Sequence, residues 1–431
     1  MPQNPTLTRR HLLQFLGAAG ASAALGGCAG PGSSTNSGPA SAAQTTGPVT
    51  GELSFAHWRA EDKAVFDQLI RQFHKRYPDA RVAQDISPSD DYQASALQQV
   101  KGGEVGDVFT AFRGAQFLDM AGAGLFADLA ALPVIDRYRT DMIQPGEYEG
   151  TQLGLPYQLV FNMPVFNADL FDQHGVSEPP DDWDGFLSLC ETLKSGGVTP
   201  MAFPGADLGN TTHLLNSMVM NNAPSTDMFT KIQSGDYACT DDWFLKTLEQ
   251  YAQLRPYVQP NATGTDVEPA EQMFASKQAA MLPTGSFHII ALRSLGVKFP
   301  VGLLSPITVP ATDAKYVGVH NATFVLGVNT ASDNQGAATA FIEYLSDPEV
   351  AAQYANATVQ HVTLDGVDYT NPDLQAIEHW LHEDTILTPI YQFTDLDISD
   401  AVSQACVDVI GGTSPQQAAE DAQQIVDERV Q

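Results

Sequence analysis

The stretch at residues 52–58, ELSFAHW, alternates apolar and polar side chains and ends in an aromatic residue, which is typical of a strand that leads into a loop. Over residues 65–77 the apolar side chains recur three and four positions apart and Pro78 follows, which predicts an amphipathic helix. Three more elements follow in the same pattern: a strand at 81–86, a helix at 91–99 and a buried strand at 106–111. Repetition of strand, helix and strand predicts an α/β fold with a parallel sheet and right-handed crossovers.

The rest of the chain adds mainly helices. Apolar periodicity predicts them at residues 115–121, 182–194, 244–254, 337–345 and 399–410. A final helix is predicted to follow Ser414 as its N-cap, with Pro415 in its first turn, and to run through Val426. Trp183 and Trp243 are interpreted as core residues on two of these helices. The chain is thus predicted to be α/β with additional C-terminal helices.

Length and charge limit the classes of fold and function. From Gly51 on, about 380 residues remain, which is more than one hydrophobic core usually serves, so two lobes are expected. The formal net charge is −30, from 51 acidic and 21 basic side chains. This balance argues against binding to nucleic acid or to an anionic bilayer surface, and it favours a neutral or cationic ligand over a polyanion.

Residues 8–28, TRRHLLQFLGAAGASAALGGC, place two arginines before a short apolar run, in the order of an export signal. The apolar run is shorter than the ~20 residues of a membrane-spanning helix. Residues 8–13 resemble a twin-arginine export motif, and residues 25–28 resemble the lipobox of bacterial lipoproteins. We therefore expect a signal peptide at 1–27 and a lipid-modified Cys28 as the mature N-terminus; a buried cysteine in a helical hairpin is the alternative.

The segment at 28–50 is predicted to be a flexible tether. Between residues 29 and 50 it consists mainly of Gly, Pro, Ser, Thr and Ala and has no charged side chain. Such a composition cannot bury enough apolar surface to offset its ordering entropy. A chain of this length has an r.m.s. reach on the order of 25 Å, enough to hold a globule near a membrane.

Three cysteines remain after Cys28, and their spacing does not suggest a zinc site. Outside the cytoplasm, Cys190 and Cys239 are the most plausible disulfide pair. Three buried free thiols, including Cys406, are an equally supported alternative.

Motifs for catalysis are largely missing. The chain has no GxxxxGK[ST], HExxH or GxSxG motif, so nucleotide hydrolysis, zinc proteolysis and the common serine-esterase mechanism lack support. A GxGxxA match at 122–127 follows a predicted helix where a dinucleotide site needs a strand. His379 and His382 lie one turn apart, but such spacing on an acidic helix usually marks a solvated face. Adjacent aspartates, as at 181–182, cannot face each other across a sugar as a glycoside hydrolase requires. We expect no catalytic residues, no metal and no cofactor.

Aromatic and neutral polar residues gather instead at the predicted ends of elements. In α/β folds, ligands bind at the carboxyl ends of strands, where aromatic rings can cover a pyranose and polar groups can bind its hydroxyls. The candidate ligand-binding residues are His57, Trp58, Arg113, Tyr157, Asn210, Thr211, Ser286, Phe287, His288, His320 and Asn321.

Several fragments, taken in order, resemble the extracellular solute-binding proteins of ABC importers, in the sugar-binding family that includes maltose-binding protein. The resembling fragments are Gly106-Asp107-Val108 (PDV), 154–157 followed by 165–171 (GLPY…YNKDLF), 180–186 (P-x-TWDEF), 274–281 with 285–287 (F-x-x-GKAAM…GSW), and 337–345 with Pro348-Glu349. Each fragment alone is weak evidence for the family. The resemblance rests on all of them occurring in the family's order after a lipobox.

The resemblance implies a two-lobed periplasmic-binding-protein fold, type II-like, whose lobes are discontinuous and close on the ligand about a hinge. Lobe 1 would comprise 51–158 plus 318–364, and lobe 2 would comprise 159–317 plus 365–431. The hinge crossings would lie near 157–162, 317–321 and 363–368. Phe287 stands where the family often has Trp, and Ile398 lies where maltose-binding protein has an aromatic residue, which disfavours a long maltodextrin ligand.

The predicted function is that of a non-catalytic, monomeric receptor, lipid-anchored through Cys28 on the outer face of the cytoplasmic membrane, that delivers a mono- or oligosaccharide to an ABC permease. Trp58, Tyr157 and Phe287 would stack on the ligand. The alternatives are the same fold binding a polyol or a polyamine, and a cell-surface glycoside hydrolase.

Overall fold

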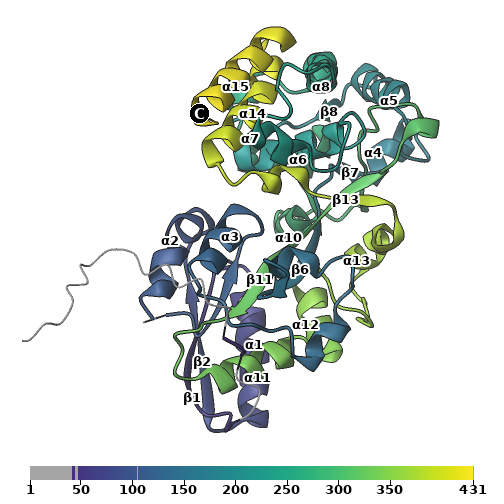
Figure 1. The fold of residues 1–431 in the computed structure, drawn as a ribbon. Helices are drawn as coiled ribbons and strands as arrows, with labels where there is room; N and C mark the ends of the chain where they lie inside the picture. The colour runs from purple at the N-terminus through teal and green to yellow at the C-terminus, as the bar shows by residue number, and fades with distance from the viewer. Residues whose placement is uncertain (1–40, 44–46, 104, 431) are drawn as a thin grey trace, which may run out of the picture. The chain divides into compact units, whose positions relative to one another are not determined.

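The computed structural model describes residues 41–43, 47–103 and 105–430 (Figure 1). The predicted signal peptide, the twin-arginine motif, Cys28 and most of the predicted tether lie outside the described residues. The end of the tether segment is not free, because Ala42 forms a β-bridge with Asp128 and the Ala43 N–H donates to the Asp128 carbonyl at 2.8 Å.

A seven-stranded sheet contains the predicted strand–helix–strand units. Its strands are β1 (Gly51–His57), β2 (Ala80–Ile86), β3 (Val108–Ala111), β6 (Leu155–Phe161), β11 (Gly318–Val328), β12 (His361–Val362) and β13 (Thr385–Leu387). The order is β12-β6-β11-β3-β1-β2, and β13 pairs with β11. β1 pairs in parallel with β2 and β3, as predicted, but β11 is antiparallel to β3 and β6. The expectation of a parallel sheet is therefore wrong for β11, which enters the sheet in the opposite direction to β6.

Helices with one apolar face cover this sheet. They are α1 (Lys63–Arg76), α2 (Ser89–Lys101), α3 (Ala115–Gly122), α11 (Gln335–Leu345) and α12 (Pro348–Thr358). In α1 the predicted apolar stripe is buried, including Phe66 and Phe73, and the helix ends before Pro78. Phe66 packs edge-on against Phe55 of β1, with ring centroids 5.2 Å apart. The period of the sequence thus fixes which face of α1 contacts the sheet.

A second, smaller sheet has four strands in the order β10-β7-β9-β8. Its strands are β7 (Val165–Asn167), β8 (Thr199–Met201), β9 (Ala279–Leu282) and β10 (Val301–Leu303). The associated helices are α4 (Ala168–Gln173), α5 (Trp183–Ser195), α6 (Leu208–Val219), α7 (Met228–Ser234), α8 (Asp242–Leu254), α9 (Val267–Ala275), α10 (Ile289–Ser294) and α13 (Pro372–Ile377). A short hairpin, β4 (Glu147–Tyr148) with β5 (Thr151–Gln152), completes the strands.

The C-terminal helices α14 (Leu396–Gly411) and α15 (Pro415–Arg429) lie side by side and pack on α8 (Figure 1). The start of α15 follows the predicted signal at Ser414. Gly412 ends α14 in the left-handed region at φ 114°, and the Ser414 side chain accepts a hydrogen bond from the Gln417 N–H at 3.2 Å. Trp183 and Trp243 are buried on α5 and α8, as predicted.

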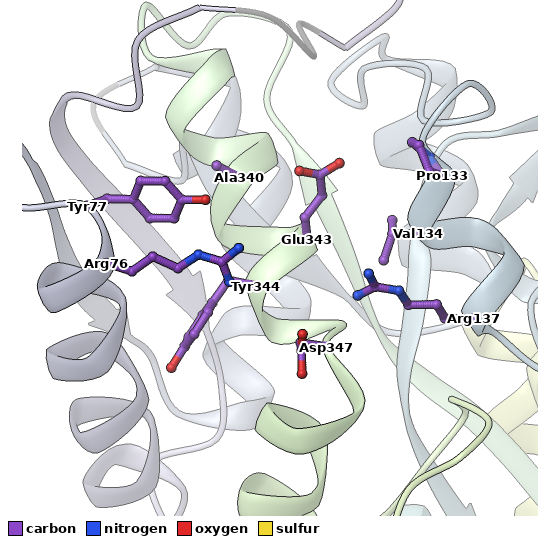
Figure 2. Close-up of a pocket in the computed structure, with 9 residues that line it drawn as sticks. All are labelled: Arg76, Tyr77, Pro133, Val134, Arg137, Ala340, Glu343, Tyr344 and Asp347. Carbon is purple, nitrogen blue, oxygen red and sulfur yellow. The ribbon is translucent and has the colours of Figure 1, made fainter.

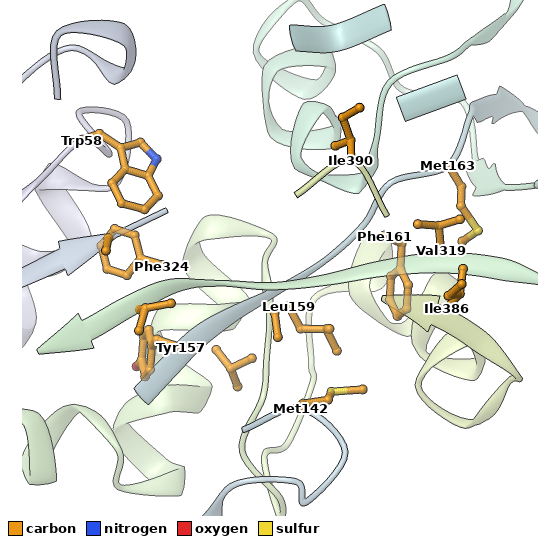
Figure 3. Close-up of a cluster of buried hydrophobic side chains, with 14 of the residues drawn as sticks. Trp58, Met142, Tyr157, Leu159, Phe161, Met163, Val319, Phe324, Ile386 and Ile390 are labelled. Atoms are coloured by element: carbon orange, nitrogen blue, oxygen red, sulfur yellow. The ribbon is translucent and has the colours of Figure 1, made fainter. Parts of the chain in front are cut away.

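The paired strands β6 and β11 lead from the larger sheet toward the smaller one. β6 continues through residues 162–164 into β7, and every residue of β11 is buried. Figure 3 shows the apolar side chains along this pair, with Phe161, Val319 and Ile386 in one group. This continuous core runs along 157–162 and 317–321, the ranges in which two hinge crossings are predicted. The crossings and the lobe boundaries given above are predictions.

Cys190, Cys239 and Cys406 are buried free thiols in the described part of the chain. The Cys190–Cys239 disulfide is therefore not formed, and the alternative of free thiols holds. Within the same residues, no helix is both long and apolar enough to cross a bilayer.

Candidate functional site

A cavity of about 190 Å³ lies where elements of the larger sheet meet elements of the smaller sheet. We call it the central cavity. From the larger-sheet side it is lined by Gln93, Phe112, Arg113, Ala115 and Gln116; from the other side by Leu208, Gly209, Thr212, Ile390, Tyr391, Phe393, Leu396, Ser399 and Asp400. It thus lies at the carboxyl end of β3, where the α/β topology predicts a ligand site.

Three helices begin at the central cavity. The first turns of α3, α6 and α14 contribute lining residues. Asp207 caps α6 by accepting from the Asn210 N–H at 3.0 Å, and Asp395 caps α14. α3 has no side-chain cap, because Gly114 precedes it. Of the three helices, α3 therefore has first-turn N–H groups without a side-chain cap, next to the lining residues Ala115 and Gln116.

Gly114 permits the close approach of the two sides. Its φ of 91° is in the left-handed region, and a Cβ at this position would lie 2.6 Å from the Tyr391 carbonyl oxygen. Glycine is therefore required here for two independent reasons, backbone conformation and space.

Arg113 is the predicted site residue that the structure places in the cavity wall. Its side chain is 9% exposed, and its Nε donates to Asn321 Oδ1 at 2.9 Å. Nη2 donates to the Thr388 carbonyl, and the guanidinium lies 5.1 Å from the Tyr391 ring centroid. Burial lowers the pKa of Arg113 to about 10. The predicted pair Arg113 and Asn321 is therefore brought together from distant parts of the chain.

Aromatic rings form part of the wall. Phe112 is half-buried and stacks on Trp58, with ring centroids 3.8 Å apart and planes 19° apart. Trp58 itself packs against Tyr92 and Phe324 and does not line the cavity. In this conformation Phe112 lines the cavity, and Trp58 packs behind it.

His57 and Tyr157 are placed in the core. His57 is fully buried; its Nε2 donates to Gln84 Oε1 at 3.0 Å and its Nδ1 accepts from the Arg59 N–H at 3.2 Å. Burial lowers the pKa of His57 to about 4, so the ring is neutral near pH 7. Tyr157 is also fully buried, and its hydroxyl donates to the Leu345 carbonyl at 3.0 Å. Neither side chain offers a surface to a ligand in this conformation.

Asn210 and His288 bind each other instead of pointing into open space. His288 Nε2 lies 3.0 Å from Asn210 Oδ1, and His288 Nδ1 lies 2.5 Å from Glu271 Oε1. Asn210 also donates from Nδ2 to Asp207 Oδ2 at 2.8 Å. This chain of contacts fixes the first turn of α6, whose next turn carries the lining residue Thr212.

The neighbouring predicted residues have similar supporting contacts. Thr211 Oγ1 donates to the Asp207 carbonyl at 2.5 Å, and Ser286 Oγ accepts from the Phe161 N–H at 3.0 Å. Phe287 is half-buried and packs edge-on against His213, with ring centroids 5.3 Å apart. None of these three residues lines the central cavity.

His320 lies on β11, next to Asn321. Its Nδ1 is 2.8 Å from Thr385 Oγ1, and its buried Nε2 has no hydrogen-bond partner among the described residues. Burial, assisted by the positive charge of Arg113, lowers the pKa of His320 to about 4. It is a neutral core residue behind Arg113.

Several lining residues were not predicted. Tyr391 follows the turn at Pro389 in a segment without a clear period, and its place in the wall depends on contacts distant in sequence. Gln116 lies three residues after Arg113; its Oε1 accepts from the Phe112 N–H at 2.8 Å. A search for amides near the predicted arginine could have found Gln116, whereas no local signal marks Tyr391 or Ser399.

Two other cavities contain none of the predicted site residues. One, of about 160 Å³, is lined by residues of α1, α11 and 133–137 and by Asp347 before α12, and its charged side chains are Arg76, Arg137, Glu343 and Asp347 (Figure 2). The other, of about 600 Å³, has mainly apolar walls along β10. In the described chain, no group of three or more His, Cys, Asp or Glu side chains could hold a metal ion, including around His379 and His382.

Comparison with known proteins relates the whole arrangement to a family. Residues 58–352 match the sequence profile described as bacterial extracellular solute-binding protein. A multiple sugar-binding protein of Streptococcus mutans serotype c is 22% identical over 362 residues, which cover 78% of this chain and 84% of the relative.

Solved structures share the fold. The apo form of RafE from Streptococcus pneumoniae superimposes with a TM-score of 0.78 at 18% identity, covering 90% of this chain and 100% of that one. A complex of the solute-binding protein RafE with raffinose gives a TM-score of 0.77 at 18% identity, with 89% and 100% coverage. These likenesses confirm the predicted two-lobed α/β fold.

Proposed function

Since the chain belongs to the family of bacterial extracellular solute-binding proteins, we propose that it is a receptor that binds a mono- or oligosaccharide between its two lobes. The family consists of solute receptors and not enzymes, so the glycoside hydrolase alternative is set aside. The observation that carries the proposal is the central cavity, in which aromatic rings and hydrogen-bonding groups from both sides face one space.

The lining chemistry suits a sugar. Phe112 and Tyr391 present ring surfaces that can cover the apolar face of a pyranose. Gln93, Thr212 and Ser399 offer polar groups for its hydroxyls. The volume of about 190 Å³ is below the ~300–1,000 Å³ of pockets for drug-sized ligands, so in this conformation it suits one small unit. The names of the relatives, a multiple sugar-binding protein and a raffinose complex, support the same class of ligand.

In this proposal, other predicted site residues hold the lining residues in place from the side away from the cavity. Trp58 supports Phe112, Asn321 holds Arg113, and Asn210 with His288 fixes the start of α6. Of the non-sugar alternatives, a polyamine is disfavoured because Arg113 is the cation in the wall. A polyol remains an alternative that the binding test decides.

We further propose that the receptor works outside the cell as a monomer and needs no cofactor. Lobe 1 would be 51–158 plus 318–364 and lobe 2 would be 159–317 plus 365–431, closing about β6 and β11. Cys28 would carry the lipid that holds the chain on the outer face of the cytoplasmic membrane, beside the permease subunits of an ABC transporter.

A thermal-shift series tests the ligand class. The full chain, purified in a non-glycosidic detergent, is heated with sugars, polyols and polyamines in turn. A ligand at 100 times its Kd stabilises the folded state by about 2.7 kcal/mol, which raises the melting temperature by several degrees. We expect this shift with a saccharide, and its loss in Tyr391→Ala but not in Tyr257→Ala, a control at a half-buried tyrosine outside the lining of the cavity. A shift with a polyol or polyamine and none with saccharides would contradict the proposal.

A further inference from the structure

We infer that the saccharide held in the central cavity carries a carboxylate, as a uronic acid does. The inference rests on the proposed function and narrows its ligand class. It begins with the Arg113 guanidinium, the only cationic side chain in the wall of this cavity within the described residues.

A second buried arginine provides an internal comparison. Arg59 is 8% exposed, and Asp62 accepts two hydrogen bonds from it, at 2.9 and 3.1 Å. Asp62 thereby helps to raise the pKa of Arg59 above its ordinary value against the effect of burial. Arg113 is 9% exposed, yet no carboxylate in the described chain lies within 4.0 Å of it. Its two bonded partners, Asn321 and Thr388, offer neutral oxygens.

A buried cation without a counter-charge is costly, and the lowered pKa of Arg113 reflects that cost. Nη1 of Arg113 has no hydrogen-bond partner among the described residues, although it is not among the fully enclosed unpartnered atoms. A carboxylate in the cavity could accept from Nη1 and supply the missing negative charge. A neutral hydroxyl could accept the hydrogen bond but not compensate the charge.

The surrounding backbone favours the same sign of ligand charge. The first turns of α3, α6 and α14 line the cavity, and α3 has no side-chain cap on its N–H groups. Asp207 and Asp395 cap α6 and α14, so α3 is the helix whose dipole and uncapped donors favour an anion here. The net charge of −30 opposes an anion at long range, but at physiological salt such interactions are screened beyond about 8 Å. The nearby positive charge of Arg113 therefore determines which sign of ligand charge the cavity prefers.

One acidic side chain opposes the inference and can be used to test it. Asp400 lies in the lining and is exposed, so its charge repels a ligand carboxylate through solvent. Tyr391 and Arg113 are the other titratable side chains in the wall. Removing the charge of Asp400 should strengthen the binding of an acidic sugar relative to that of its neutral counterpart.

The experiment is titration calorimetry of the full chain with matched pairs, D-galacturonate against D-galactose and D-glucuronate against D-glucose. We expect one uronate to bind at least 10-fold more tightly than its neutral partner. In Arg113→Met that preference should fall about 10-fold or more, and in Arg113→Lys by less, because the charge remains but the fork geometry is lost.

Asp400→Asn should raise uronate affinity about 2- to 5-fold at low salt, and the gain should disappear at high salt. Glu249→Gln on α8 is the matched control, an exposed acid outside the cavity, and should change neither affinity. Should Arg113→Met fail to fold, Asp400→Asn decides, and an unchanged uronate affinity overturns the inference.

The two proposals fail in different ways. Neutral sugars that bind as tightly as their uronates would overturn the inference and leave the saccharide receptor standing. Binding of neither class, or binding of simple carboxylates such as succinate with no saccharide bound, would overturn both.

Discussion

Gly114 is the residue at which the two sides of the binding site touch. Replacement by Ala forces a left-handed backbone conformation and places a Cβ 2.6 Å from the Tyr391 carbonyl oxygen. We expect Gly114→Ala to lower the free energy of unfolding by about 1–3 kcal/mol and to weaken ligand binding, because Tyr391 must move. Gly124→Ala is the matched control: its φ is 74°, but no atom lies within 4 Å of the added carbon. Chemical denaturation and calorimetry of both variants separate backbone strain from displacement of Tyr391; equal ligand affinities in the two would contradict this account.

His57 makes the stability of the fold depend on pH. Burial lowers its pKa from 6.5 to about 4. Between these values the unfolded chain binds a proton that the native protein does not, so stability falls as the pH falls and is complete above about pH 6.5. From pH 7 to pH 5 this group should cost about 2 kcal/mol. Urea unfolding at both pH values should show a loss that is smaller by this amount in His57→Gln than in the unmodified protein. The other buried histidines contribute equally in both proteins, so their effect cancels in the comparison. An equal loss of stability in the two proteins would exclude His57 as a source of the pH dependence.

At the scale of elements, the start of α6 connects stability to ligand binding. Asp207 accepts hydrogen bonds from the Asn210 N–H and Asn210 Nδ2, and this turn leads into the cavity wall. Asp207→Ala should cost about 1 kcal/mol of stability and lower ligand affinity several-fold. Ser414→Ala removes the cap of α15, so it should cost a similar stability without changing affinity. Thermal unfolding and calorimetry of both variants make the comparison, which would fail if the two altered binding equally.

The elements themselves were largely predictable, because their signals are local. The alternation in β1, the stripe of α1 and the caps of α14 and α15 each appear within a few residues of sequence. The antiparallel return of β11 was not, since strand direction depends on where the chain re-enters the sheet. The same limit applies to the site. Arg113 was found from its place after a strand, but sequence could not show that His57 points into the core while Tyr391 reaches the cavity from a distant turn.

For the whole molecule, the proposed anchor resolves a conflict between charge and location. A chain of net charge −30 is repelled by an anionic bilayer, so a receptor that works at the membrane needs a covalent attachment. Two or more acyl chains on Cys28 would hold it stably, where a single chain would give only marginal binding.

Cells fed labelled palmitate test the anchor directly. We expect the protein to incorporate the label and Cys28→Ala to reduce it to background, because the acyl chains have lost their attachment site. Cys406→Ala is the matched control, since Cys406 is a buried thiol on α14 and its removal should leave the label unchanged. Mass spectrometry of the mature N-terminus should show cleavage before Cys28. Label retained in Cys28→Ala, or an unmodified N-terminus, would contradict the proposed lipid anchor at Cys28.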